Sequence, residues 1–153
     1  FTQIGDRYGE AMSQMGLAIV ERQEGELERA LELLDRALSL AQDMGDRRLE
    51  AAVKGNMAGV RGQLEDYERA AHLYGEVLVI SRDLGDRHGE GLTLMNLGLT
   101  AAQAEDLDGA RDRWQEALSV FQDMGVPEED RVREWLEKID DNKPPRDEAA
   151  MTL

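Results

Sequence analysis

The chain of 153 residues contains no cysteine, three prolines and very few aromatic residues. Without cysteine it can form neither a disulfide nor a thiolate site, which fits a reducing compartment, and we expect a cytoplasmic location. Neither a signal-peptide pattern nor an apolar run of about 18 residues is visible, so we predict no membrane-spanning segment. Aromatic residues make up only 5% of the chain, so its core must come mainly from Leu, Ala and Met, as in helical repeat proteins.

Positive charge is also scarce. The chain has 18 Lys and Arg residues against 33 Asp and Glu residues, which gives a formal net charge of −15. No basic stripe is present that could neutralise phosphates, so we expect no binding to nucleic acid or to anionic membranes. The acidic residues are spread along the chain, and their simplest role is to keep the surface soluble.

Residue patterns that carry chemistry are missing as well. The only histidines, His72 and His88, lie in different contexts and do not have the spacing of paired metal ligands. Asp140, Asp141 and Asn142 lack the rest of a calcium loop. No glycine-rich phosphate loop and no nucleophile motif is visible. We therefore predict no enzymatic activity, no metal and no cofactor.

What the chain does have is repetition with a period of 40 residues. Gly-Asp-Arg recurs at residues 5–7, 45–47 and 85–87. A fixed period of this length indicates a stack of similar supersecondary units. We predict repeats at 5–44, 45–84 and 85–124. Phe1 aligns with Phe121 at the end of a repeat, so we interpret residues 1–4 as the end of a preceding repeat helix in a longer protein.

Each period contains two helical patterns separated by a short break. In the third repeat a first run of apolar residues at helical spacing is followed by Glu105 and Asp106, and then by a second such run. Such a short break predicts two antiparallel helices, and hence an all-α fold. In Gly-Asp-Arg the glycine is suited to end one helix and the aspartate to cap the next. Asp66 and Asp106 are candidate caps within the repeats, and Glu26 is a weaker one.

The C-terminal part departs from the repeat. Gly125-Val126-Pro127 replaces Gly-Asp-Arg, and an amphipathic pattern follows that does not share the register of the first helices. We predict a capping helix over residues 125–139, which covers the end of the stack. Residues 140–153 are polar and contain Pro144-Pro145, so we predict a flexible tail.

The order of small and large residues resembles that of the tetratricopeptide repeat. In the third repeat the matching positions are Leu94, Leu97, Gly98, Ala101, Ala110, Trp114 and Ala117. In the second repeat Lys54 stands where the pattern has an apolar residue. The resemblance implies an α-solenoid, a right-handed superhelix of antiparallel helix pairs whose first helices line a concave groove. The 40-residue form is similar to arrays in actinobacterial transcriptional regulators, in signalling NTPases and in animal polarity adaptors.

The resemblance also implies which residues form the partner-binding wall of the groove. These are Met12, Met15, Gly16, Ile19, Arg22 and Gln23 in repeat one, Ala52, Gly55, Asn56, Gly59, Gly62 and Gln63 in repeat two, and Leu92, Met95, Asn96, Leu99, Ala102 and Gln103 in repeat three. Among them only Arg22 is charged. Asn56 and Asn96 match a family asparagine that often bonds the backbone of a bound peptide, although a solvated or helix-bonded asparagine is the other interpretation. The methionines suit an adaptable apolar surface.

Gly55, Gly59 and Gly62 share one helix face, although each glycine inside a helix costs about 0.5–1 kcal/mol relative to alanine. Either a neighbouring helix of the chain packs there, or a pit admits a partner's helix or an extended peptide. We therefore predict a protein-interaction scaffold that binds a peptide and serves as the sensor or adaptor segment of a larger regulatory protein. A homodimerisation module and a small-molecule sensor are the alternatives.

Overall fold

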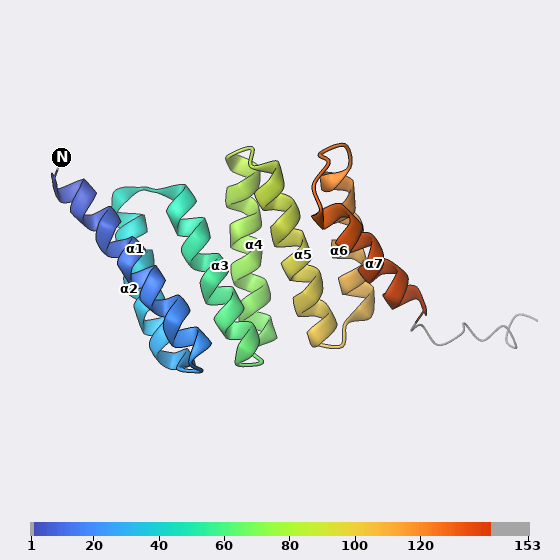
Figure 1. Ribbon diagram of the computed structural model, residues 1–153, viewed down its shortest axis with the longest axis horizontal. Coiled ribbons are helices and arrows are strands. Elements are labelled where there is room, and N and C mark those ends of the chain that lie inside the picture. Colours follow the sequence, from blue (N-terminus) through green and yellow to red (C-terminus); the bar gives the residue numbers. More distant parts are fainter. Residues whose placement is uncertain (1, 142–153) are drawn as a thin grey trace, which may run out of the picture.

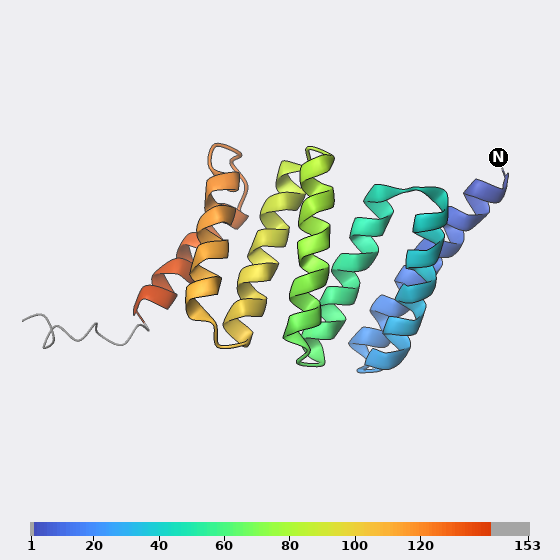
Figure 2. The same ribbon diagram turned by 180° about the vertical axis from the view of Figure 1, so that it is seen from behind.

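The computed structural model describes residues 2–141, with the backbone alone for residues 2–4, and this part consists of helices without any strand. The helices are α1 (Thr2–Gln23), α2 (Leu27–Met44), α3 (Arg47–Gln63), α4 (Tyr67–Asp83), α5 (Arg87–Gln103), α6 (Leu107–Phe121) and α7 (Glu128–Asp141). Each packs against its neighbours in chain order, so the molecule extends from α1 at one end to α7 at the other (Figure 1). Figure 2 shows the molecule from behind, with α2, α4 and α6 toward the viewer. The prediction of an all-α solenoid of helix pairs is confirmed.

The joints between repeats form as predicted. Gly45 and Gly85 adopt φ angles of 66° and 68°, the left-handed conformation that ends a helix and that glycine adopts without steric cost. Asp46 then accepts a hydrogen bond from the Leu49 N–H at 3.0 Å, and Asp86 accepts one from the Gly89 N–H at 2.9 Å. One short segment therefore closes a helix and opens the next at both joints.

The joints within repeats use the same kind of cap. Asp66 accepts from the Arg69 N–H at 3.3 Å and Asp106 from the Gly109 N–H at 2.9 Å. Within residues 2–141 the side chain of Glu26 makes no capping hydrogen bond. Aspartate places its carboxylate closer to the backbone than glutamate does, which explains why the shorter side chain is the effective cap.

The core of the third repeat is built around Trp114. This residue is 4% exposed, and its Nε1–H donates to the carbonyl oxygen of Met95 at 3.1 Å. Gly98 makes room for the indole, because a Cβ there would lie only 2.1 Å from Nε1. Trp114 is therefore a core residue, and the small residue at position 98 lets the two helices pack closely around its ring.

The predicted capping helix is present as α7, which packs on α6. Val132 and Ile139 are buried, and the rings of Trp135 and Trp114 lie 5.2 Å apart between centroids. The bounds differ from the prediction, since Asp140 and Asp141 belong to the helix and not to a tail. Arg111 holds Asp140 with a 3.1 Å ion pair, a contact that favours continuation of the helix. The rest of the predicted tail lies outside the described residues.

Residues 1–4 were expected to form the end of a preceding repeat helix. Residues 2–4 belong to α1, which continues through Gly5 without a break. A glycine lowers helix stability by only about 1 kcal/mol, so it ends a helix mainly where the chain must also reverse. At Gly45 and Gly85 the chain reverses into the next helix, whereas Gly5 lies inside α1.

Candidate functional site

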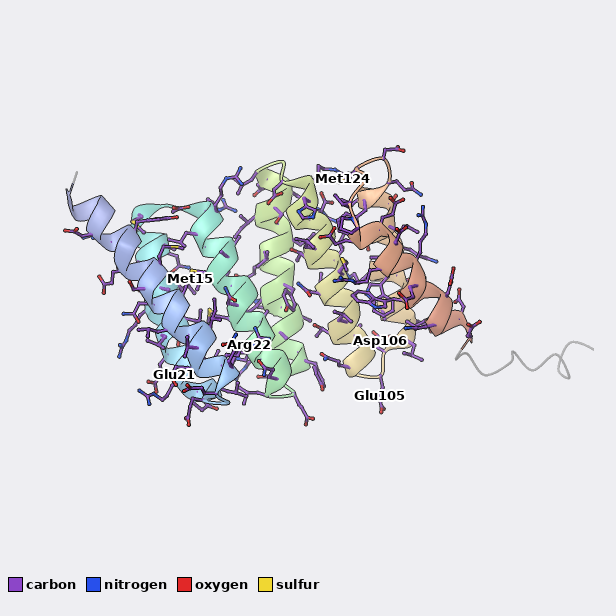
Figure 3. The ribbon with its side chains drawn as sticks, in the orientation of Figure 1. Met15, Glu21, Arg22, Glu105, Asp106 and Met124 are labelled. Atoms are coloured by element: carbon purple, nitrogen blue, oxygen red, sulfur yellow. The ribbon has the colours of Figure 1, made fainter. Side chains whose placement is uncertain are left out.

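The first helices α1, α3 and α5, together with α4, enclose two adjoining hollows of about 220 and 450 Å³. Four residues line both hollows: Arg22 of α1, Gly59 of α3, Tyr74 of α4 and Asn96 of α5. We call these hollows together the central groove. Figure 3 labels Arg22 near the end of α1, where its side chain lies beside α3.

The glycines of α3 form the open floor of the central groove. A Cβ at Gly59 would lie 2.6 Å from Nη1 of Arg22, so the guanidinium rests directly on the helix backbone. Nε of Arg22 donates a hydrogen bond to Oε1 of Gln63, which fixes this position. In contrast, no atom beyond the helix's own backbone and chain neighbours lies within 4 Å of a Cβ at Gly55 or Gly62. Thus α1 covers Gly59 with one side chain, while no described helix fills the pit on either side.

The groove is polar but carries a single formal charge. Arg22 is the one charged residue that lines either hollow, in a chain whose net charge is −15. Burial raises the pKa of Tyr74, and the nearby charge of Arg22 opposes this rise, so the phenol stays neutral and can donate or accept a hydrogen bond. A guanidinium beside neutral amides and a phenol suits recognition of backbone carbonyls and a carboxylate.

The asparagines differ in their engagement. Nδ2 of Asn56 donates to the carbonyl oxygen of Ala52 at 3.0 Å, one turn earlier in the same helix. Asn56 therefore has the helix-bonded role among its two interpretations, although it also lines one of the hollows. Asn96 lines both hollows from α5.

The central groove brings together most of the predicted wall. Its predicted members are Arg22, Ala52, Gly55, Asn56, Gly59, Gly62, Gln63, Asn96, Leu99 and Gln103. Met12 and Ile19 are exposed on α1, at 45% and 43%, but do not line these hollows. Gln23 and Gly16 are exposed, and Leu92 and Ala102 are half-buried.

Met15 and Met95, which were expected on the partner-binding wall, are buried in the structure. Their exposure is 9% and 5%, and each is part of one of the two core clusters. A methionine is long and flexible enough to turn from the edge of the groove into the gap beneath it, where burial of its thioether is favourable. Gly55 occupies the same register in the middle repeat and leaves that space open.

Sequence reasoning missed four residues that line the groove. Thr93 and Thr100 come from α5, and Tyr74 and Val77 come from α4, a second helix that lies behind the wall. Tyr74 is half-buried. The signal that could have found it is the glycine run in α3, because a first helix without side chains exposes whatever lies behind it.

Other hollows lie elsewhere on the surface. One, of about 690 Å³, lies between α4 and α6, and another, of about 970 Å³, lies beside Arg69 and His72. Both are larger than either part of the central groove, and charged side chains border them. Within residues 2–141 no cluster of His, Asp or Glu could hold a metal ion. No described helix combines the length and the apolar character that a membrane span requires.

The family follows from a match that spans most of the chain. A family model described as tetratricopeptide repeat matches residues 9–83 and 47–123, so the two matches overlap and extend over residues 9–123. The chain belongs to the tetratricopeptide repeat family. Tetratricopeptide repeats are generally protein–protein interaction scaffolds. No curated protein matches the sequence.

Solved structures share this tetratricopeptide fold at low sequence identity. BtubC from P. vanneervenii is 22% identical with a TM-score of 0.77, over 84% of this chain and 54% of that one. The apo form of RapI is 17% identical with a TM-score of 0.79, over 87% and 49%. The N-terminal domain of stress-induced protein-1 from C. elegans is 16% identical with a TM-score of 0.70, over 88% and 97%. The present chain thus spans about half the length of the first two. These likenesses concern the fold.

Proposed function

We propose that this tetratricopeptide repeat segment binds an extended peptide of a partner protein in the central groove, as the sensor or adaptor segment of a larger cytoplasmic regulator. The observation that carries the proposal is the bare backbone of α3, open at Gly55 and Gly62 and covered at Gly59 only by Arg22. The spacing of 40 residues between the starts of α3 and α5 supports the link to signalling and transcription regulators.

The groove offers a peptide three kinds of contact. The glycine floor lets a peptide backbone approach α3 closely. Asn96 and Tyr74 supply hydrogen bonds to backbone groups, since both carry donors and acceptors. Arg22 supplies the single positive charge, so a peptide with one acidic residue among neutral neighbours fits better than a basic one.

Gly59→Leu tests the groove directly. Peptides are first selected from a displayed random 12-residue library on the wild-type chain, and the affinity of the best peptide is then measured by calorimetry. A leucine at position 59 occupies the pit and displaces Arg22. We therefore expect the affinity for the peptide to fall at least about tenfold, equivalent to about 1.4 kcal/mol of binding free energy. The helix content, measured by circular dichroism, should stay unchanged.

Gly75→Leu is the matched control. Gly75 also lies within a helix and has no atom within 4 Å of its Cβ position, but it lines neither hollow. The control should therefore bind the peptide as the wild type does. If Gly59→Leu binds with wild-type affinity, the central groove is not the binding site.

A further inference from the structure

A second groove runs between α4 and α6, with the C-terminal half of α5 between them. It has a volume of about 690 Å³, and we call it the α4–α6 groove. In Figure 2 this side of the molecule faces the viewer. Its lining includes small or apolar residues of all three helices, Ala71, Leu97, Ala101 and Gly109. Only Thr100 also lines the central groove, so the two grooves are separate surfaces.

Negative charge predominates in the α4–α6 groove. Its charged side chains are four carboxylates and one guanidinium: Glu68, Asp106, Asp112, Glu116 and Arg113. The guanidinium of Arg113 pairs with Glu116 at 3.5 Å, and these two charges therefore offset each other. Within residues 2–141 the other three carboxylates form no ion pair. An apolar lining is thus combined with an excess of negative charge.

The equivalent joint of the second repeat shows what such a carboxylate binds. Asp66 lies 40 residues before Asp106, and it caps α4 as Asp106 caps α6. In addition, Asp66 forms ion pairs with two arginines, Arg61 of α3 at 3.7 Å and Arg69 of α4 at 3.5 Å. The charge of this helix cap is therefore neutralised within the second repeat.

The third repeat keeps the capping carboxylate but lacks both arginines. Ala101 and Gly109 occupy the two positions 40 residues later, and both line the α4–α6 groove. Asp106 is exposed, whereas Asp66 is half-buried. The groove thus presents a carboxylate without a counter-charge, next to the space that arginine side chains occupy in the preceding repeat.

We infer that the α4–α6 groove is a docking site for a basic segment of a partner protein, which places an arginine on Asp106. The guanidinium takes the role that two arginines have at Asp66, and the aliphatic part of the side chain lies on Ala101. Glu68 and Asp112 attract a second basic residue of the segment. Arginine fits better than lysine, because its planar group can donate two hydrogen bonds to one carboxylate.

A basic partner fits this groove better than any part of the chain itself. The chain has a net charge of −15, so a second copy is repelled. Residues 142–153 contain two basic and two acidic residues and bring no excess of positive charge. The central groove, where Arg22 is the only charged residue, favours the opposite kind of segment. The inference therefore does not depend on a peptide binding there.

A short arginine peptide tests the docking site. The blocked peptide GAARAARAG is titrated into the isotope-labelled chain and followed by NMR in about 150 mM salt, which screens attraction between distant charges. We expect saturable shifts of amide signals at residues 67–71, 97–101 and 104–116, with a dissociation constant of about 1 mM or lower. The same peptide with glutamine in place of both arginines should give no saturable shifts.

Asp106→Asn and Asp66→Asn form a matched pair of variants. Asparagine is also a good helix cap, so each variant loses one charge and keeps its fold, which circular dichroism checks. Asp106→Asn should weaken peptide binding about fivefold or more, because the docked guanidinium loses its carboxylate. Asp66→Asn should bind the peptide as the wild type does, because Arg61 and Arg69 already pair with that carboxylate.

Ala101→Arg is a second test, and it leaves the helix cap intact. The new side chain has the position of Arg61 in the preceding repeat, so it should pair with Asp106, fill the groove and weaken peptide binding to a similar extent. Equal weakening by Asp106→Asn and Asp66→Asn would overturn the inference, since the peptide would then respond to net charge alone. Shifts confined to the central groove, or no saturable shifts at about 5 mM peptide, would overturn it as well.

Discussion

Lys54 lies at a first-helix position where the repeat pattern expects an apolar residue. Its amine bonds Glu50 at 3.0 Å and also Glu76 of α4, while its side chain is 11% exposed. The sequence shows the departure but not its solution, because Glu76 is 22 residues away and reaches Lys54 only when α3 and α4 pack together. A charge at this position is thus neutralised across the helix pair.

This ion pair predicts a pH dependence of stability. Burial lowers the pKa of Lys54, but its bonds with Glu76 and Glu50 outweigh burial and raise it overall. The bond with Lys54 lowers the pKa of Glu50 below its ordinary value of 4.5, against the opposing effect of burial. The contribution of Glu50 is therefore complete above pH 4.5 and is lost as the pH falls through its lower folded pKa.

We expect the free energy of unfolding of the wild type, measured by urea titration, to fall as the pH drops below 4.5. In Lys54→Met the decline attributable to Glu50 should be smaller, because the group that lowers its pKa is gone. A parallel acid decline in both proteins would show that the pair does not stabilise the fold. At the alkaline end, the contribution of Lys54 is complete below pH 10.5 and is lost as the pH rises through its raised folded pKa.

The residues of the central groove were predictable to different degrees. Arg22, Gly59 and Asn96 followed from the resemblance to the tetratricopeptide repeat, which implies that one side of each first helix lines the groove. Met15 and Met95 were assigned to the same side but are buried, since their direction depends on the space beneath the helix. Register alone specifies the side of a helix on which a residue lies, and packing decides how far its side chain turns inward.

At the scale of helices, the caps separate two superficially similar acidic residues. Asp106→Ala should lower the free energy of unfolding by about 0.5–2 kcal/mol, because the Gly109 N–H loses its acceptor. Glu26→Ala is the control and should have little effect, since Glu26 precedes α2 without a side-chain cap bond. Urea titration measures both. Equal losses in the two variants would contradict the role of the aspartate caps.

Helix boundaries were predictable where the signal is local. Gly45-Asp46 and Gly85-Asp86 carry both the end of one helix and the cap of the next, and the structure follows them. The end of α7 was missed because it depends on a contact between distant parts of the chain, since Asp140 is held by Arg111, 29 residues earlier. Gly5 lies inside α1, so the Gly-Asp-Arg sequence does not by itself end a helix.

At the scale of the molecule, the core is divided into two clusters, one within α1–α3 and one centred on α5–α7. In a solenoid each unit contacts its neighbours only, so a core deletion should act mainly on its own cluster. Trp114→Ala should cost about 3–5 kcal/mol in unfolding. Hydrogen exchange should accelerate in α5–α7 more than in α1–α3. Equal acceleration throughout would show that the stack unfolds as one unit, and a silent substitution would contradict the place of Trp114 in the core.

The two joints between repeats have nearly the same backbone, with φ angles of 66° and 68° at their glycines and −86° and −82° at the following aspartates. A stretch from one glycine to the next is therefore an interchangeable cassette. Genes for such proteins can gain or lose a whole cassette by recombination while every remaining junction keeps its geometry. The length of the concave surface, and with it the length of the segment it can accommodate, can evolve in steps of one repeat independently of the residues that confer specificity.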